Sequence, residues 1–281
     1  MSITTTRRAA AAAATLLVIA FTAACHDGGV EKSDPAVFTW NGPLQPPGTL
    51  HLRNVNGSVQ VRPSRDSLVH VLVGARWRRG NPRTDLKFSV ISGHDDVTIC
   101  IIWGKGSCGE HNFTTGPGFL GFMNRGTDAT VALTVEVPSR VKVDAFTANG
   151  SIDIAATAPV KAVDVNGNVR VATAVGPVDA ITVNGSVDAR MTTIGADTGM
   201  VRAETVNGSA RAYVPANVDA DYTLKVVNGG IDNDFAVAGT PQSKTQAGLL
   251  GKGGRQIVVK TMNGGVALHK LNADGTPMVQ P

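Results

Sequence analysis

The chain has 281 residues and a formal net charge of +4, from 26 Lys and Arg against 22 Asp and Glu. Only 17% of residues are charged and 5% are aromatic, while 42% are hydrophobic and 32 are glycine. This composition excludes a coiled coil, which would show heptads, and a charged disordered chain, which could not fill a core. It favours a Gly-rich β protein with many turns. The small net charge gives no indication of nucleic-acid binding.

Residues 1–24 are expected to be an export signal. Arg7 and Arg8 form a short basic region, and residues 9–24 form an apolar stretch that is too short for a comfortable membrane span. The small residues before Cys25 are similar to the lipobox of bacterial lipoproteins, in which the cysteine is acylated, although Thr22 stands where that pattern prefers Leu. The alternative is an ordinary signal peptide with Cys25 incidental.

Lipidation at Cys25 would anchor a mature chain of 257 residues, which is the 281 residues less the first 24. His26 follows the cysteine where an Asp would favour the inner membrane, so the pattern favours the outer membrane, on its periplasmic or surface face. Residues 25–37 are then a linker between the lipid anchor and the folded part.

Cys100 and Cys108 are expected to form a disulfide. Export places them in an oxidising compartment, and strand residues followed by a glycine turn separate them, so a hairpin would bring the sulfurs together. The alternative is a metal or redox pair, but the spacing differs from C-x-x-C and no His cluster accompanies it. The sequence therefore predicts no metal site and no cofactor.

One short phrase containing Asn-Gly occurs seven times in the chain. Both residues tolerate positive φ, so each pair marks a turn. From the second copy onward most steps are near 20 residues, which is typical of a solenoid rather than of separate hairpins. The seven asparagines are Asn56, Asn149, Asn166, Asn184, Asn207, Asn228 and Asn263.

Aligning the repeats on the asparagine gives inward apolar columns and two outward columns whose charge alternates in sign. Equivalent residues of a parallel, in-register stack lie about 4.8 Å apart, where opposite charges attract and like charges repel. The alternation therefore predicts a parallel β-helix with two charge ladders on its outer face. The first ladder comprises Asp153, Arg170, Asp188, Arg211 and Asp232, and the second Asp144, Lys161, Asp179 and Arg202.

The domain organisation follows from where the phrase occurs. Residues 38–61 are expected to form a first coil, 136–271 the repeats, and 272–281 a flexible tail. Residues 62–135 lack the phrase, and they are expected to form an antiparallel β insertion with strands over 67–77, 86–91, 97–103 and 129–137.

A Gly-rich loop over residues 104–127 carries several large apolar side chains, including Phe119 and Phe122. Loops of this length in a compact domain are usually functional. Two interpretations are open. The aromatic side chains either plug the open end of the β-helix, since solenoids need caps, or contact a partner.

The Gly-rich loop at 251–254, the strand after it and Thr261-Met262-Asn263-Gly264 resemble the end of a bacterial putative-adhesin family of unknown function. The early phrase LHLRNVNGSVQV and the stretch VTICIIW are also similar. The resemblance covers roughly residues 38–270, and related head domains of autotransporter adhesins are right-handed parallel β-helices. It implies an adhesin-like fold and no catalytic residue.

The leading functional hypothesis is a non-catalytic binding or structural module of the cell envelope, whose partners are the membrane, through the anchor, and an unidentified envelope protein or glycan. A polysaccharide lyase or hydrolase on the same scaffold is the first alternative, but each outward Asp is predicted to have a basic neighbour. An envelope-stress signalling partner is the second. A basic hairpin tip could contact anionic lipid or glycan, or could simply be solvated. It comprises Arg76, Trp77, Arg78 and Arg79.

Overall fold

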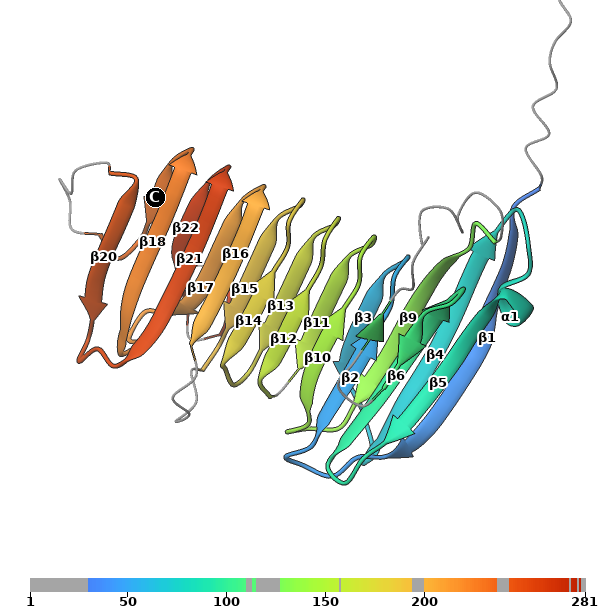
Figure 1. Ribbon diagram of the computed structural model, residues 1–281. Helices are drawn as coiled ribbons and strands as arrows, with labels where there is room; N and C mark the ends of the chain where they lie inside the picture. The colour runs from blue at the N-terminus through green and yellow to red at the C-terminus, as the bar shows by residue number, and fades with distance from the viewer. Residues whose placement is uncertain are drawn as a thin grey trace, which may run out of the picture.

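The computed structural model describes residues 30–109, 113–114, 127–156, 158–193, 200–236, 243–272, 274–276 and 278. The chain is all-β, with two ten-stranded mixed sheets that do not close into a barrel. Sheet A has the strand order β1-β4-β9-β3-β11-β13-β15-β17-β22-β19 and sheet B the order β20-β18-β21-β16-β14-β12-β10-β2-β6-β5. The two sheets form an elongated stack, with β18 and β20 at one end and β1 and β5 at the other (Figure 1).

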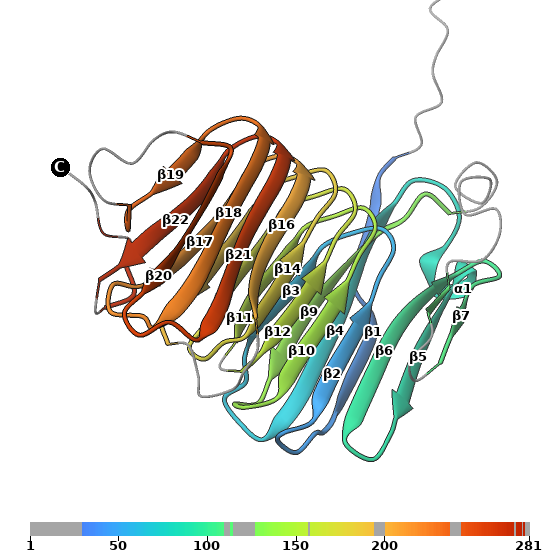
Figure 2. The ribbon, with the colours of Figure 1, turned by 60° about the vertical axis from the view of Figure 1, so that its left-hand side comes forward.

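In the middle of the molecule successive strands alternate between the two sheets. Each even-numbered strand from β10 to β16 lies in sheet B and the next strand lies in sheet A, and all pair in parallel with their neighbours. Figure 2 shows the sheet B strands side by side. The strands are β10 (Lys142–Phe146), β11 (Ile152–Ala156), β12 (Val160–Val163), β13 (Val169–Thr173), β14 (Val178–Ile181), β15 (Val187–Met191), β16 (Val201–Asn207) and β17 (Ala210–Pro215).

The N-terminal end continues both sheets with parallel and antiparallel strands. Of the segment 62–135, predicted to be an antiparallel insertion, β4 and β5 are antiparallel, but β6 pairs in parallel with β2 and β9 in parallel with β3. Strands β6 and β9 therefore pair antiparallel on one side, as predicted, but the prediction was wrong for their other side, because the apolar residues that identify a strand do not show how each edge pairs. The strands are β1 (Lys32–Pro43), β2 (Thr49–Arg53), β3 (Val59–Pro63), β4 (Leu68–Trp77), β5 (Leu86–Ser92), β6 (Asp96–Trp103) and β9 (Thr130–Val137).

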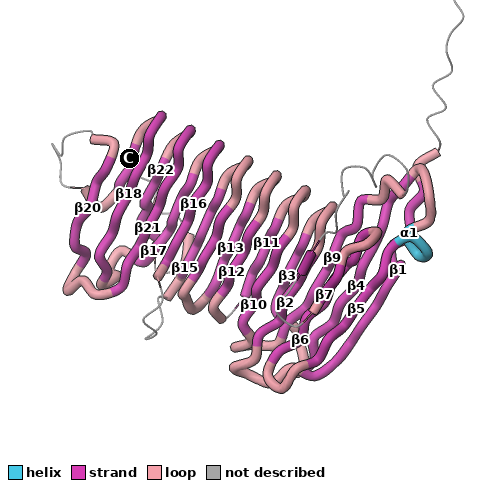
Figure 3. Tube along the Cα trace, viewed as in Figure 1, coloured by secondary structure: helices cyan, strands magenta, loops and turns pink. Residues whose placement is uncertain are grey.

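A short helix and a small hairpin complete this end. Helix α1 (Pro82–Asp85) joins β4 to β5 (Figure 3). The Asn81 side chain caps it by accepting from the Arg83 backbone N–H. Strands β7 (Ser107–Cys108) and β8 (Phe113–Thr114) pair with each other. The predicted disulfide between Cys100 and Cys108 is confirmed, and it ties β7 to β6.

The order of coils at the C-terminal end differs from their order in the chain. The last two strands are inserted between β16–β17 and β18–β19, so that Asn263 lies between Asn207 and Asn228. Strand β20 covers the outer edge of β18 in antiparallel pairing. The strands are β18 (Ala220–Asn228), β19 (Ile231–Asn233), β20 (Thr245–Leu250), β21 (Arg255–Asn263) and β22 (Val266–Leu271).

The core lies between the two sheets and is filled from alternate positions of the strands in the middle coils. These coils contribute small side chains, such as Ala162 and Ala180 from sheet B and Val169 and Val187 from sheet A, all buried. The N-terminal end contributes larger ones, including Trp103. The alternation of buried and less buried residues along the middle strands follows from the two-residue period of β structure, whereas β6 is buried over five consecutive residues.

The Asn-Gly corners are stacked on one another along the molecule. From Asn166 onward each Asn side-chain amide donates to the Asn side chain of a neighbouring coil, as from Asn184 to Asn166 and from Asn207 to Asn184, both at 2.8 Å. A Cβ placed on Gly185 would lie 2.0 Å from the Gly167 carbonyl oxygen, and Gly185 has a φ of 148°. These corners therefore require glycine for space as well as for conformation.

Candidate functional site

The outer face of sheet B carries a row of polar side chains from five consecutive strands. The parallel register places His51 beside Asp144, Asp144 beside Lys161, Lys161 beside Asp179, and Asp179 beside Arg202. The last four residues are the second charge ladder of the sequence analysis. The first of the five, His51, extends that row into β2.

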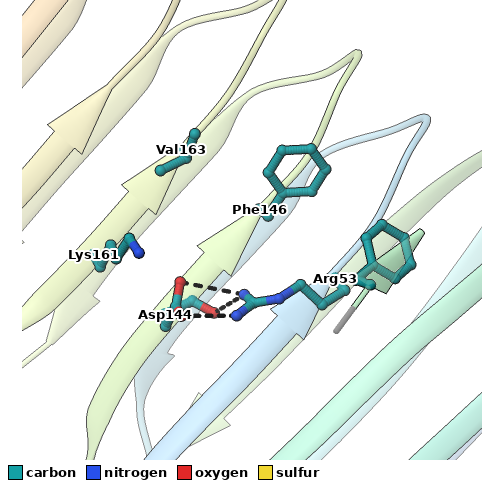
Figure 4. Close-up of a pocket in the computed structure, with 6 residues that line it drawn as sticks. Arg53, Asp144, Phe146, Lys161 and Val163 are labelled. Atoms are coloured by element: carbon teal, nitrogen blue, oxygen red, sulfur yellow. Dashed lines mark hydrogen bonds and ion pairs between the residues drawn. The ribbon is translucent and has the colours of Figure 1, made fainter. Parts of the chain in front are cut away.

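A partly buried ion pair between β2 and β10 is the centre of this face. Arg53 Nη2 lies 2.7 Å from Asp144 Oδ2, and Nη1 lies 3.2 Å from Oδ1, while Nη1 also donates to the Asp144 carbonyl at 2.8 Å. Both side chains are less than one-fifth exposed. Figure 4 shows the contacts between Arg53 and Asp144. His51 Nδ1 lies 3.1 Å from the same carboxylate, so three polar groups hold one another in a fixed arrangement.

The environment of Asp144 keeps its carboxyl group ionised. Burial raises the pKa of Asp144, but the hydrogen bonds from His51 and Arg53 and the positive charges of Arg53 and Lys161 outweigh burial and hold the pKa well below its usual range. Asp144 is consequently an anion over the whole physiological pH range, and it cannot donate a proton in general acid catalysis.

Aromatic and aliphatic side chains line the space beside the ion pair. Phe146 and Phe113 meet edge to face, with ring centroids 6.0 Å apart and an interplanar angle of 61°. Arg53, Phe113, Asp144, Phe146, Lys161 and Val163 line a hollow of about 340 Å³, which we call the Arg53 hollow (Figure 4). Phe113 belongs to β8, whose partner β7 carries Cys108, so the disulfide to Cys100 holds this hairpin near β6.

A second hollow adjoins the first on the same sheet. It has a volume of about 450 Å³, shares Asp144 and Lys161 with the Arg53 hollow, and is bounded further along by Pro159, Pro177 and Met200. Met200 is 44% exposed. The two hollows together form a continuous surface across β2, β10, β12 and β14, with charged groups between two apolar margins.

The first charge ladder lies on the outer face of sheet A. Asp153 is beside Arg170, Arg170 beside Asp188, and Asp188 beside Arg211. Arg211 Nη1 lies 3.0 Å from Asp188 Oδ1, and Arg170 Nε lies 4.0 Å from Asp188 Oδ2.

The prediction that Asp232 continues this ladder was wrong. Ala267 of β22 lies between Arg211 and Asp232, because the last coil in the chain is inserted before the coil that carries Asp232. The sequence distance between repeats does not determine which coils are neighbours.

The other predicted binding residues lie away from these hollows or outside the described residues. Arg76, Arg78 and Arg79 are exposed at the end of β4, and half-buried Trp77 packs against the core. The Asp128 carboxylate accepts hydrogen bonds from the backbone N–H groups of Arg78 and Arg79, which fixes this tip. Cys25, Phe119 and Phe122 lie outside the described residues.

Sequence reasoning missed His51, Arg53, Phe113 and Phe146. Three of them could have been found, because extending the alignment to the first coil places His51 in the column of Asp144 and Arg53 in the column of Phe146. Phe113 has no such signal, since it lies outside the repeats.

In the described part of the chain, no three His, Cys, Asp or Glu side chains gather in a way that could hold a metal ion. No helix among those same residues has the length and hydropathy needed to cross a membrane.

Several solved structures resemble this chain at low similarity. A "putative cell adhesion protein" from Clostridium sporogenes is 12% identical, with a TM-score of 0.41 over 84% of this chain and 99% of that one. A "putative adhesin" from Bacteroides fragilis is 10% identical, with a TM-score of 0.32 over 84% and 97%. One from Parabacteroides distasonis is 11% identical, with a TM-score of 0.21 over 85% and 97%.

No protein-family model and no curated protein matches the sequence. At TM-scores below 0.5 the solved structures define neither the family nor the function of this chain. The surface of this molecule therefore provides the evidence for its function.

Proposed function

We propose that this protein is a non-catalytic binding module of the bacterial cell envelope, built as an adhesin-like β-helix that presents the outer face of sheet B to a ligand. The observation that carries the proposal is the Arg53 hollow, in which a fixed ion pair between the adjacent strands β2 and β10 lies beside two aromatic rings, one from β10 and one from the β8 hairpin strand. Sites of this kind are concave, largely apolar and fitted with a few oriented polar groups.

The scaffold supports binding because it holds the site rigidly. Arg53, Asp144 and Lys161 project from three neighbouring strands in one hydrogen-bonded sheet, and an Asn–Asn amide bond ties the corners of the coils that carry Asp144 and Lys161. Side chains carried on strands keep their geometry better than side chains carried on loops, so little conformational entropy is lost when a ligand binds.

The chemistry of the hollow indicates the kind of ligand. Among the described residues no carboxylate lies within ion-pair distance of Lys161, so its ammonium group is available to a ligand. Phe113, Phe146 and Val163 offer an apolar wall on the other side. A ligand with an apolar or ring-shaped face and a nearby anionic group satisfies both, and an envelope glycan or an envelope protein can supply that combination.

The protonation states support binding rather than hydrolysis. A glycosidase needs an acid whose pKa is raised so that it can protonate the leaving group. Asp144, at the centre of the face, has a lowered pKa. Burial raises the pKa of Asp164 to about 6, but this residue is 1% exposed and lies between the sheets, where it cannot reach a substrate.

The proposal is tested with the full chain in detergent against a panel of soluble envelope polysaccharides and peptides. The variant Phe146→Ser/Lys161→Glu removes the apolar wall and reverses the free charge. Any ligand of the Arg53 hollow should bind it at least about tenfold more weakly, since one lost interaction of about 1.4 kcal/mol changes an affinity tenfold.

The matched control is Gln60→Ala/Thr134→Ala, which changes two exposed outward positions on sheet A. This control variant should bind the ligand as the wild type does. A ligand that binds the wild type and the Phe146→Ser/Lys161→Glu variant equally well would place binding elsewhere and overturn the proposed site.

We also propose that the protein is exported and anchored at the outer membrane by a lipid on Cys25. The proposal rests on the basic and apolar segments before Cys25 and on the small residues at positions 23 and 24. Metabolic labelling with a radioactive fatty acid should label the wild type and leave Cys25→Ala unlabelled. Labelling of both forms would contradict anchoring at this cysteine.

A further inference from the structure

A third hollow lies on the outer face of sheet A. The row of side chains there runs Ala155, Ala172, Arg190, Tyr213 and His269 from β11 to β22, as the parallel register places them. The two alanines have short side chains and Arg190 and Tyr213 have long ones, so the surface is recessed above the alanines. The resulting hollow has a volume of about 280 Å³ and is lined by Asp153, Arg170, Ala172, Asp188, Arg190 and Tyr213. We call it the Arg190 hollow.

The charges around the Arg190 hollow do not balance. Arg62 Nη1 lies 3.0 Å from Asp153 Oδ1, and Arg211 Nη1 lies 3.0 Å from Asp188 Oδ1, so both carboxylates already have an arginine partner. Arg170 reaches Asp188 only at 4.0 Å, and its side chain is 64% exposed.

Arg190 has no carboxylate within ion-pair distance among the described residues, and its guanidinium lies over the Tyr213 ring. The four arginines around the hollow therefore exceed the two aspartates by two positive charges.

A chain of contacts fixes the position of Arg190. Its guanidinium carbon lies 5.4 Å from the centroid of the Tyr213 ring, and that ring lies 5.1 Å from the ring of His269. His269 Nδ1 lies 3.3 Å from Asp234 Oδ2, which also accepts from the Lys270 backbone N–H at 3.0 Å. A guanidinium stacked on an aromatic ring keeps its N–H edge free for an oxyanion.

We propose that the Arg190 hollow binds an oxyanion, held between Arg170 and Arg190, on a small molecule or at the end of a larger one. Planar guanidinium groups match carboxylate and phosphate oxygens with paired N–H donors, and Arg170 and Arg190 supply such donors at a hollow where arginines outnumber carboxylates. The inference is independent of the proposed function, because it concerns a different sheet and different residues. The shared chemistry is the oxyanion, which a sugar acid or a phosphate ester can supply.

The test is a titration of the full chain in detergent with three probes at constant ionic strength. Sodium phosphate and sodium glucuronate represent the two sources, and glucose is the neutral control. Binding is followed through the Nε–Hε NMR signals of the arginines. We expect the signals of Arg170 and Arg190 to shift together and to saturate with at least one anionic probe, and glucose to leave them unchanged.

The variants separate a built site from general attraction to positive charge. Arg190→Gln and Arg170→Gln should each weaken binding at least tenfold, whereas Arg76→Gln, at the exposed tip of β4, should leave the affinity unchanged. Arg190→Lys keeps the charge but loses the paired donors, so it should bind more weakly than the wild type and more tightly than Arg190→Gln.

Saturation by phosphate alone identifies a phosphate ester as the source, and saturation by glucuronate alone identifies a sugar acid. Saturation by both supports a general oxyanion site. The proposal is overturned if neither probe shifts the two signals at about 20 mM. Even a weak site with a Kd of about 1 mM would be nearly saturated at that concentration. It is overturned equally if Arg190→Gln and Arg170→Gln, shown to be folded by circular dichroism, bind as the wild type does.

Discussion

Replacing Asp164 by asparagine should stabilise the protein at neutral pH. Two positions before the Asn of several corners, a buried threonine donates to a glycine carbonyl, as Thr182 Oγ1 does to Gly167 at 3.0 Å and Thr205 Oγ1 does to Gly185 at 2.8 Å. Asn54 fills the same place in the first coil, where its Nδ2 donates to Gly57 and Val131. Asp164 is the member of this column that donates only when it is protonated.

The surroundings of Asp164 favour the protonated form. Its Oδ1 accepts from the Val165 backbone N–H at 2.7 Å, while its buried Oδ2 has no hydrogen-bond partner. A Cβ placed on Gly167 would lie 1.4 Å from the Gly150 carbonyl oxygen and 2.5 Å from Asp164 Oδ2, so these two oxygens are close neighbours. Burial raises the pKa of Asp164 from 3.8 to about 6, against the opposing backbone N–H groups of Val165 and Asn166.

The sign and the size of the effect follow from the raised pKa. A carboxyl that holds its proton more tightly in the folded state lowers stability as pH rises from the unfolded value, 3.8, through the folded value of about 6. Each pKa unit of difference corresponds to about 1.4 kcal/mol, so ionisation costs up to about 3 kcal/mol above pH 7. Asp164→Asn removes this cost and supplies a permanent donor, as Asn54 does.

Urea unfolding of the wild type and Asp164→Asn between pH 4 and pH 8 measures the difference. We expect similar free energies of unfolding at pH 4 and an advantage of about 2–3 kcal/mol for Asp164→Asn at pH 8. Asp232→Asn, at an exposed position, is the control for removing one negative charge. A difference in free energy of unfolding between the two proteins that is the same at every pH would contradict a raised pKa of Asp164. Lower stability of Asp164→Asn than of the wild type at pH 8 would contradict it equally.

Three further changes test the corners and the charge ladder. Asn184→Ala removes a side-chain amide that is hydrogen-bonded to both Asn166 and Asn207, so the free energy of unfolding in urea should fall by about 1–3 kcal/mol. An unchanged value would show that the stacked Asn amides contribute nothing to stability. Gly185→Ala places a Cβ 2.0 Å from a carbonyl oxygen at a φ of 148°, so the Tm of this variant should fall by many degrees. The control is Gly230→Ala, where a Cβ would meet no atom within 4 Å. Equal Tm values for the two variants would contradict the packing of the corners. Arg170→Glu places three carboxylates side by side on adjacent strands, so it should destabilise the protein by about 1–2 kcal/mol at low salt and by less at high salt. A loss of stability that does not depend on salt would argue against an electrostatic cause.

The parallel pairing of the middle coils could be predicted because their outward charges alternate in sign. Asp144, Lys161, Asp179 and Arg202 follow one another across four strands in the order that the alternation requires. Only a parallel, in-register stack brings equivalent positions of successive repeats together, so the charges carried information about register that the apolar columns did not.

The order of the last two coils could not be predicted from the repeat itself, because each copy of the phrase can pair with any other copy. A weaker signal was present in the column of buried donors. Thr261 donates to the Gly208 carbonyl at 2.9 Å, whereas Val226, at the same position of the coil before it in the chain, has no donor. The coil with Thr261 can therefore bond to the coil of Asn207 beside it. The coil with Val226, which has no such side-chain donor, lies at the end of the stack.

The candidate site was only partly visible in the sequence for a similar reason. Lys161 and Asp144 were found as members of a ladder, but a ladder alone predicts neutral pairs rather than a binding site. The hollow arises where this row meets Phe146 and Phe113, and Phe113 is brought there by the hairpin that the Cys100–Cys108 disulfide ties to β6. Long-range placement of this kind depends on tertiary packing rather than on periodicity.

The most direct test of the central claim is to recover a ligand after it has bound. The full chain is incubated with a polysaccharide or peptide that binds the Arg53 hollow, and the complex is isolated and the ligand examined by mass spectrometry. Binding without catalysis predicts that the ligand is recovered at its original mass and that Phe146→Ser/Lys161→Glu retains far less of it. Recovery of a shortened ligand from the wild type, with no shortening by Asp144→Asn, would contradict the account and indicate an enzyme.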